Sequence, residues 1–360
     1  MKKKIIIIVS AIFSFFVIGL ISLVIFYNIS LGAVSTKEEA KNITFIVESG
    51  SSSKGIVDSL YNNGLIKNKY VGYVYVKLQS NFILQAGVYD LNTSMDMKTI
   101  IDTISNGKVI DNSISVTFVE GKRITNYVKT INEKFGYTEK EILEIISDEA
   151  YLKELINKSC FLTEDILNDK LYYALEGYLY PNTYRFEKDA SVKAIVEKML
   201  NTTGVQLNKY KELLNDSKYS VHEILTMASI VELEGANSDD RFGVAGVFYN
   251  RLNGYMSLGS DVTTYYGARV EMSDRDLYVN ELNEVNDYNT RPAAMIGKLP
   301  IGPISNPSIN SIEAALKPTE HDYFYFVADK NMKTYFTKTY NEHMAVVSQL
   351  KKDGLWYVYE

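Results

Sequence analysis

Residues Val221 to Glu234 read VHEILTMASIVELE, and this stretch decides how the second half of the chain is interpreted. Apolar side chains recur at steps of three and four residues, which predicts a helix, and Gly235 follows as its stop. The recurring residues are Ile224, Leu225, Ala228 and Val231. Glu232 continues the same stripe, so we expect its carboxyl to be partly desolvated, and a desolvated carboxyl keeps a proton available near neutral pH.

The same periodicity leaves a second acid open. Glu234 follows Ile230 and Met227 at the spacings that relate Glu232 to its own stripe. For either glutamate the structural alternative is an ion pair with a nearby arginine, such as Arg241 or Arg251. The pattern by itself therefore predicts a buried acid at the end of this helix without choosing between the two.

The N-terminus predicts a membrane anchor. Three lysines, Lys2 to Lys4, precede an uncharged run from Ile5 to Phe26 that is long enough to cross a hydrocarbon core of about 30 Å. Because lysines favour the cytoplasmic side, we expect residues 1–4 inside, a transmembrane helix over 5–27, and everything beyond it outside. A cleaved signal peptide is the alternative, but its apolar run is usually only about 7–15 residues long.

Beyond the anchor we expect a polar spacer over 28–41 and then a small module of strands and helices. Thr44 to Glu48 is predicted to be a strand, Ser53 to Asn63 a helix capped by Gly64, Ala86 to Leu91 a second strand, and Met97 to Ser105 a second helix. A further strand over Ile114 to Val119 leads into a helix carrying Ile124, Tyr127, Val128 and Ile131, and Glu139 to Asn157 is predicted to be helical. The fold class expected is α+β, with the longer C-terminal part a mixed α/β domain.

Composition excludes several functional classes. A net charge of -6 and a pI near 5.4 argue against a nucleic-acid partner, whose phosphates require a basic face. The single cysteine, Cys160, cannot form an intramolecular disulfide. His222 and Glu223 begin like a zinc-protease helix, but Thr226 stands where the second histidine must be, so we expect no metal site and no cofactor.

Several spaced motifs resemble the endolytic murein transglycosylases of the MltG or YceG-like family. They are ASIVE ending at Glu232, VAGVFYNRL from Val244 to Leu252, and LGSD with Thr263 and YG, from Leu258 to Gly267. The likeness continues upstream in EGYLYPNTY, from Glu176 to Tyr184, and downstream in YNT, from Tyr288, and GPISNP, from Gly302 to Pro307. It covers most of the chain, from about Ile43 to His343.

This resemblance implies a LysM-like module over 42–110 and a catalytic YceG-like domain over 111–360. It implies that Glu232 is the catalytic acid and that Glu234 is a neighbour. Other motif positions are expected to line the substrate cleft, with a structural hydrogen bond inside a loop as the alternative for each. These are Glu176, Tyr184, Ser260, Asp261, Thr263, Tyr288, Asn289 and Asn306. Val262, Arg291 and Ile301 depart from the family pattern, which puts the sugar contacts of these loops in doubt but not the acid.

The activity implied is cleavage of the β-1,4 bond between N-acetylmuramic acid and N-acetylglucosamine, leaving 1,6-anhydro ends on the glycan strand. Glu232 would act first as general acid and then as general base. The outward-facing anchor makes nascent peptidoglycan near the membrane the expected target and membrane peptidoglycan synthases candidate partners. The alternative is a protein that binds or scaffolds wall glycan without cutting it.

Overall fold

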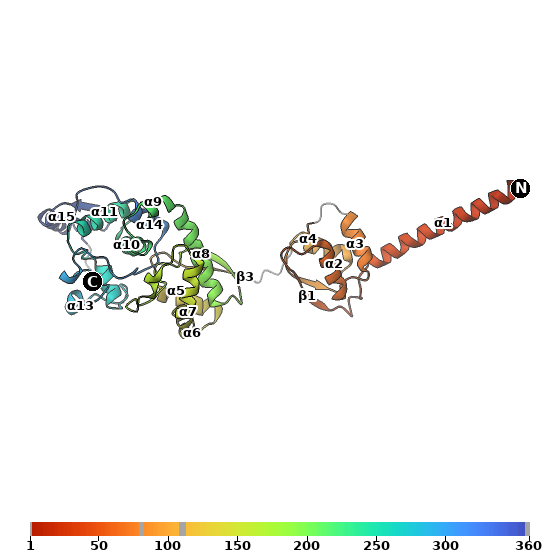
Figure 1. Cartoon of the computed structure of the whole chain (residues 1–360), viewed down its shortest axis with the longest axis horizontal. Helices are drawn as coiled ribbons and strands as arrows, with labels where there is room; N and C mark the ends of the chain where they lie inside the picture. The colour runs from red at the N-terminus through yellow and green to blue at the C-terminus, as the bar shows by residue number, and fades with distance from the viewer. Residues whose placement is uncertain (1, 79–82, 108–112, 357–360) are drawn as a thin grey trace. The chain divides into compact units, whose positions relative to one another are not determined.

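The computed structural model describes residues 2–78, 83–107 and 113–356. The chain divides into two compact units, residues 1–112 and 113–360, and Figure 1 shows the helices and strands of each. The boundary expected between residues 110 and 111 lies outside the described residues.

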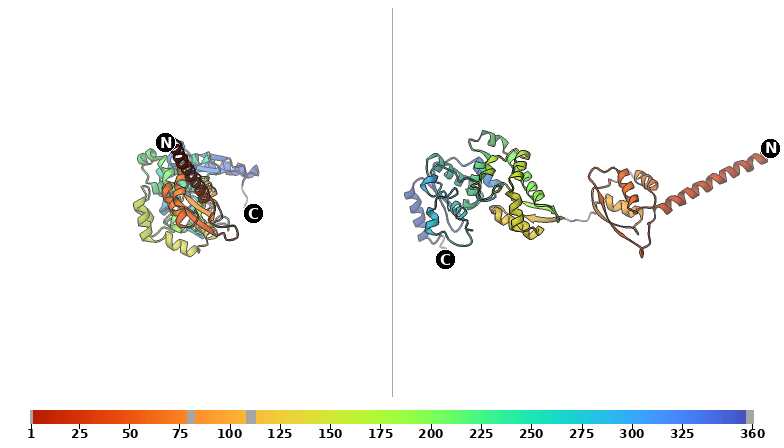
Figure 2. Two further views of the ribbon diagram at one scale, coloured as in Figure 1. Left: turned by 90° about the vertical axis from the view of Figure 1, so that its right-hand side faces the viewer. Right: turned by 60° about the horizontal axis from the view of Figure 1, so that its bottom comes forward.

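Unit 1 begins with helix α1, Lys2–Leu31, which Figure 2 shows as one continuous helix from two further sides. Its segment Phe13–Leu31 is long and apolar enough to cross a membrane, and it is the one such helix in the part of the chain that the structure describes. The helix runs four residues beyond the predicted end at Tyr27. Tyr27 and Leu31 pack against the core of unit 1, which explains why the helix continues.

Residues 28–41, expected to be a polar spacer, make contacts within unit 1. Ser30, at the end of α1, is buried. The hydroxyl of Ser35 and the backbone N–H of Lys41 both contact the Thr93 hydroxyl, at 2.7 and 3.0 Å. Two positions of this segment are thus tied to Thr93 of the same unit.

The rest of unit 1 has the order strand, helix, helix, strand, helix. Its elements are β1 Asn42–Val47, α2 Ser53–Asn62, α3 Lys69–Leu78, β2 Gly87–Asn92 and α4 Met97–Ser105. The two strands pair antiparallel with Phe45 opposite Tyr89, and both residues are buried beneath the helices. Side chains of Ser52 and Asp96 cap α2 and α4, as these residue types do at helix starts. The strands and helices predicted here are confirmed to within two residues at each end.

In the first half of unit 2, helices pack against one short two-stranded antiparallel sheet. Strands β3 Ser113–Thr117 and β4 Thr183–Glu187 pair antiparallel with Val116 opposite Tyr184. Between and after them lie α5 Ile124–Phe135, α6 Glu139–Ile146, α7 Glu149–Lys158, the 3-10 turn η1 Glu164–Leu167, α8 Val192–Asn208 and α9 Lys211–Asp216. The single helix predicted over Glu139 to Asn157 is wrong: Asp148 leaves the helical path and accepts a hydrogen bond from Tyr151 N, which starts a second helix.

The second half of unit 2 surrounds the predicted central helix. Its elements are α10 Val221–Glu234, α11 Asp240–Asn253, α12 Asp261–Gly267, α13 Val279–Asn283, the 3-10 turn η2 Ala293–Met295, α14 Ile309–Leu316, β5 Tyr325–Ala328, β6 Thr334–Thr337 and α15 Tyr340–Lys352. Strands β5 and β6 form a second antiparallel pair. The predicted mixture of helices and strands is confirmed.

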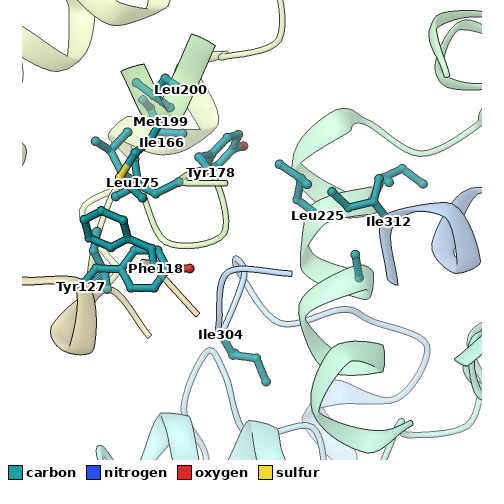
Figure 3. Close-up of a cluster of buried hydrophobic side chains, with 14 of the residues drawn as sticks. Phe118, Tyr127, Ile166, Leu175, Tyr178, Met199, Leu200, Leu225, Ile304 and Ile312 are labelled. Carbon is teal, nitrogen blue, oxygen red and sulfur yellow. The ribbon is translucent and has the colours of Figure 1, made fainter. Parts of the chain in front are cut away.

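Helix α10 lies in the core of unit 2. It packs against α14, α11 and α12, and its side chains are buried from Ile224 to Glu232 without a break. Figure 3 shows Leu225 of α10 beside Ile312 of α14. Ile304, from the loop that precedes α14, belongs to the same core cluster. The apolar stripe predicted from the sequence is therefore one face of a helix that is apolar all round, as expected for a helix enclosed on every side.

Candidate active site

Glu232 lies in the last turn of α10, where the core ends. The helix starts with a capping box between Ser220 and Glu223 and ends at Gly235. These two ends fix which residues occupy the final turn. Glu232 is 7% exposed, so its predicted burial is confirmed.

The Glu232 carboxylate accepts four hydrogen bonds. Arg241 Nη2, from α11, lies 2.8 Å from Oε1. The other oxygen, Oε2, accepts from the backbone N–H of Ser308 at 2.8 Å, from the Ser308 hydroxyl at 2.5 Å and from the Ser311 hydroxyl at 2.7 Å. The pairing with Arg241 that the sequence left open is therefore present, and the glutamate is not the solitary acid expected from the apolar stripe.

The residues around the Glu232 carboxylate pack closely against one another. Arg241 also donates from Nη1 to the Ser308 hydroxyl at 2.9 Å, which ties the arginine to α14. A Cβ atom at Gly235 would lie 2.5 Å from Arg241 Cγ, so only glycine lets the arginine approach here. The buried Arg241 Nε has no hydrogen-bond partner among the described residues, which leaves one donor beside the carboxylate uncommitted.

Glu234, the second acid predicted at this helix end, has a different environment. Its Oε1 accepts one hydrogen bond, at 2.6 Å, from the Ser260 hydroxyl that precedes α12. Burial raises the pKa of Glu234, and the hydrogen bond from Ser260 opposes that shift only in part. Two carboxyl groups on one helix end are thus held differently: Glu232 by an arginine and two serines, Glu234 by one serine.

Glu176 is more deeply buried than either, with 1% of its surface exposed. Its carboxyl accepts from Ile124 N at 2.9 Å, from the Tyr266 hydroxyl at 3.1 Å and from Asn306 Nδ2 at 3.2 Å. Burial raises the pKa of Glu176 to about 8, although these hydrogen bonds act in the opposite direction. The contacts join the start of α5, the end of α12 and the loop before α14, so this carboxyl holds three segments together.

The residues at the start of α12 mostly bind one another. Thr263 is fully buried, and its hydroxyl donates to Ser260 O at 2.7 Å and contacts the Thr290 hydroxyl at 2.8 Å. Asp261 is exposed and forms an ion pair with Arg291. Arg291 stands where the sequence departs from the family pattern, and its partner is a motif residue.

The remaining predicted cleft residues are buried with their polar groups already paired. The Tyr288 hydroxyl accepts from Tyr172 N, Asn289 Nδ2 donates to Glu284 O at 2.7 Å, and Asn306 Oδ1 accepts from Gly177 N and Leu179 N. The Tyr184 hydroxyl donates to Tyr180 O within the β3–β4 core. For these four residues the described contacts are the loop-holding hydrogen bonds weighed as the alternative.

Sequence reasoning missed Ser308 and Ser311. A serine before Ile309 is a signal for a helix start, and Ser308 does cap α14 through Ser311 N. Nothing in one sequence shows that this helix start faces the end of α10, 76 residues earlier. Pairing between helices so far apart needs the three-dimensional fold.

The described residues hold no group of three or more His, Cys, Asp or Glu side chains placed to bind a metal. His222 uses both ring nitrogens, toward the Tyr178 hydroxyl and Ile301 O, each at 2.8 Å. Its imidazole is a core residue that links α10 to two loops.

Most of the chain is similar in sequence to known proteins. The model of the YceG-like family matches residues 45–349. The chain is 36% identical over 321 residues to the endolytic murein transglycosylase of Bacillus subtilis strain 168, covering 88% of this chain and 87% of that protein. It is 29% identical over 320 residues to the endolytic murein transglycosylase of Streptococcus pneumoniae strain D39, covering 84% of this chain and 57% of that longer protein.

A solved structure is also similar. The crystal structure of a yceG-like protein from Listeria monocytogenes superposes with a TM-score of 0.61 at 34% sequence identity. The match covers 86% of this chain and all of that chain. The likeness therefore extends through both fold and sequence.

Proposed function

Because this chain belongs to the YceG-like family, we propose that it is an endolytic peptidoglycan lytic transglycosylase. The relatives that carry this activity in their names align over most of the chain, and the family model spans residues 45–349. The reaction would cut the β-1,4 bond between N-acetylmuramic acid and N-acetylglucosamine and leave a 1,6-anhydro end.

The main support for the proposal is the structural environment of Glu232. It is a buried carboxyl at the end of a rigid core helix, held at both oxygens by residues of two other helices. A group held this firmly is suited to repeated proton transfer at one fixed point, because catalysis requires the reacting group in a defined geometry.

In the first step Glu232, protonated, gives its proton to the glycosidic oxygen as that bond breaks and positive charge develops on the muramic ring. The C6 hydroxyl of the same ring then attacks C1, and Glu232, now ionised, takes the hydroxyl proton. The proton count closes, and no water is consumed. A lytic transglycosylase therefore needs one acid where a two-carboxylate hydrolase needs a second group.

Two of the partners of Glu232 suit both protonation states, whereas Arg241 and the Ser308 backbone N–H only donate. A serine hydroxyl either donates to an ionised carboxyl or accepts from a protonated one, so Ser308 and Ser311 can stay in place while the proton moves. Arg241 only donates, and it stabilises the ionised form that receives the proton from the C6 hydroxyl. We assign these three residues to positioning Glu232.

We further propose that α1 anchors the chain in the cytoplasmic membrane as a single span, with Lys2, Lys3 and Lys4 inside and both folded units beyond α1 outside. The β1-α2-α3-β2 order of unit 1 supports a LysM-like module that binds glycan. In that arrangement nascent strands near the membrane are the substrate, and membrane peptidoglycan synthases are candidate partners.

The test is digestion of purified wall glycan by the detergent-solubilised full chain, with the fragments weighed by mass spectrometry. Anhydro-ended fragments are expected. Fragments heavier by one water would make the protein a hydrolase, and binding without fragments would make it a glycan-binding or scaffold protein. Either of these results contradicts the proposal.

A further inference from the structure

A small cavity lies beside the segment that touches Glu232. Its volume is about 120 Å³, roughly four times the ~30 Å³ that one water takes in the liquid. It is lined by Arg123 and Thr125 at the start of α5, by Tyr172 and Tyr173 in the loop before β4, by Tyr266 and Arg269 at the end of α12, and by Glu271. A space of this size accommodates a carboxylate or a phosphate.

Two arginines of the cavity are held against tyrosine rings. The Arg269 guanidinium carbon lies 4.0 Å from the Tyr172 ring centre, and that of Arg123 lies 5.1 Å from the Tyr266 ring centre. The two rings stack on each other, 5.6 Å apart and 21° from parallel. A guanidinium held flat on an aromatic ring keeps its N–H groups directed outward at its edge, where they can meet an anion.

Three donors of this cavity are uncommitted, while the Tyr172 and Tyr266 hydroxyls donate to Gly267 O and to Glu176. Within the described ranges the Arg269 guanidinium makes no hydrogen bond and no ion pair, and the Thr125 and Tyr173 hydroxyls have no hydrogen-bond partner. The other arginines are all engaged, including Arg123, which donates to Val270 O at 2.8 Å and pairs with Glu271 at 3.4 Å. Two arginines against the single carboxylate of Glu271 leave the cavity with an excess positive charge.

Arg269 also has an unusual backbone conformation. Its φ is +57°, in the left-handed region that glycine and asparagine adopt at lower cost than arginine does. The conformation ends helix α12, where Arg269 N donates to Tyr266 O and Val270 N donates to Tyr265 O, each at 2.9 Å. Stability alone would favour asparagine or glycine at this position.

The cavity is close to the proposed acid. A Cβ atom at Gly121 would lie 3.5 Å from Glu232 Cγ, and Arg123 follows two residues later. Two residues span at most about 7 Å, so the segment that contacts Glu232 also carries one wall of the cavity. Stem peptides leave the glycan strand from the muramic ring on which Glu232 would act.

We propose that this cavity binds an anionic group of the glycan strand, with the Arg269 guanidinium as its principal contact. The inference rests on the proposed function for the identity of the strand. Two groups of the strand share the required chemistry: a carboxylate of the stem peptide, and a phosphate at a lipid-linked strand end.

The test measures binding to the full chain in detergent by calorimetry, with probes that contain no bond to cut. The first is an N-acetylmuramoyl peptide with free carboxylates, compared with the same peptide with its carboxylates amidated. The second is inorganic diphosphate. Because no cleavage is required, the result is independent of whether the protein is a transglycosylase.

Arg269→Asn is the informative variant, since asparagine tolerates the backbone conformation and removes the guanidinium. Lys188→Asn, at an exposed lysine on the turn after β4, is matched for charge. We expect the wild type and Lys188→Asn to bind one anionic probe with a Kd about tenfold lower than Arg269→Asn does, as for one charge-assisted contact. Arg269→Lys should fall between, since it keeps the charge without the two-pronged geometry.

Each result of these binding measurements either supports or overturns the proposal. Loss of the preference for free over amidated carboxylates in Arg269→Asn supports the cavity and identifies the stem peptide as the source. Loss of diphosphate binding alone supports the cavity and identifies the lipid-linked end. Equal binding of both probes by the wild type and Arg269→Asn overturns the proposal, and thermal unfolding of the variant checks that a loss of binding is not a loss of fold.

Discussion

Replacing Glu232 by glutamine should cause two separate losses, one of activity and one of stability. The substitution keeps the shape of the side chain and removes its negative charge. The side chains of Glu232 and Arg241 are only 3% and 13% exposed, so the arginine would be left as a buried cation without its partner. A simple exchange of acid for amide is therefore not neutral for the fold at this position.

The loss of activity and the loss of stability have different causes and different sizes. Loss of general acid and base help should lower kcat by about 10²–10⁴-fold. Breaking a buried ion pair from one side costs about 3–5 kcal/mol, and the amide oxygen can still accept from Ser308 and Ser311, which favours the lower end, about 3 kcal/mol. At about 2–4 °C per kcal/mol for a domain of this size, Tm should fall by roughly 6–12 °C.

A double-mutant cycle with Arg241→Met separates the two losses. In the Arg241→Met background no unpaired cation remains, so Glu232→Gln should lower Tm by less than it does in the wild type, while activity stays lost. Glu133→Gln, at an exposed glutamate on α5, is the control and should change neither quantity.

Activity is measured by mass of the released fragments well below the lowest Tm, and stability by thermal unfolding. If Glu232→Gln keeps kcat within tenfold of the wild type, Glu232 is not the acid. If the fall in Tm is the same in both backgrounds, the reasoning from the ion pair is wrong.

Three further predictions concern neighbouring residues. Glu234→Gln should keep kcat within about tenfold of the wild type, because Glu234 is expected to be a neighbour; a loss beyond about 100-fold would move the acid to Glu234. Burial raises the pKa of Glu176 to about 8, so the folded state keeps this proton after the unfolded chain has lost it near 4.5. The free energy of unfolding should therefore fall as pH rises from about 4.5 to about 8, and Glu176→Gln should flatten that slope in denaturant titrations; an unchanged slope would exclude Glu176 as its source. Gly177→Ala should cost about 2–5 kcal/mol, since φ is +82° and the new Cβ would lie 2.3 Å from Pro303 Cβ, and a change below 1 kcal/mol in chemical unfolding would contradict this.

Local patterns in the sequence predicted the local structure well. The starts of α2, α4 and α10 carry serine or aspartate caps followed by periodic apolar residues, and these helices lie where they were expected. The prediction over Glu139 to Asn157 was wrong because Asp148 can cap a new helix, and apolar periodicity continues across such a break.

The environment of Glu232 could be predicted only in part. Its burial follows from the apolar pattern of α10, which is a local property. Its partners Arg241, Ser308 and Ser311 come from two other helices, and no periodicity in one sequence brings those helices together. Motif positions do not distinguish a residue that binds substrate from one that holds the loop next to it, so the sugar contacts of Asn306 and Tyr288 stay predictions beside their loop hydrogen bonds.

The contact between Glu232 and α14 has a consequence for when activity can arise during synthesis. Ser308 and Ser311 follow the glutamate by 76 and 79 residues, so a chain that emerges from N-terminus to C-terminus contains its acid long before it contains the groups that orient it. If Glu232 is the acid, as proposed above, a chain made in this order gains its activity only when its final helices are in place. Fragments that end before Ser308 should be inert for the same reason, whatever part of the glycan they still hold.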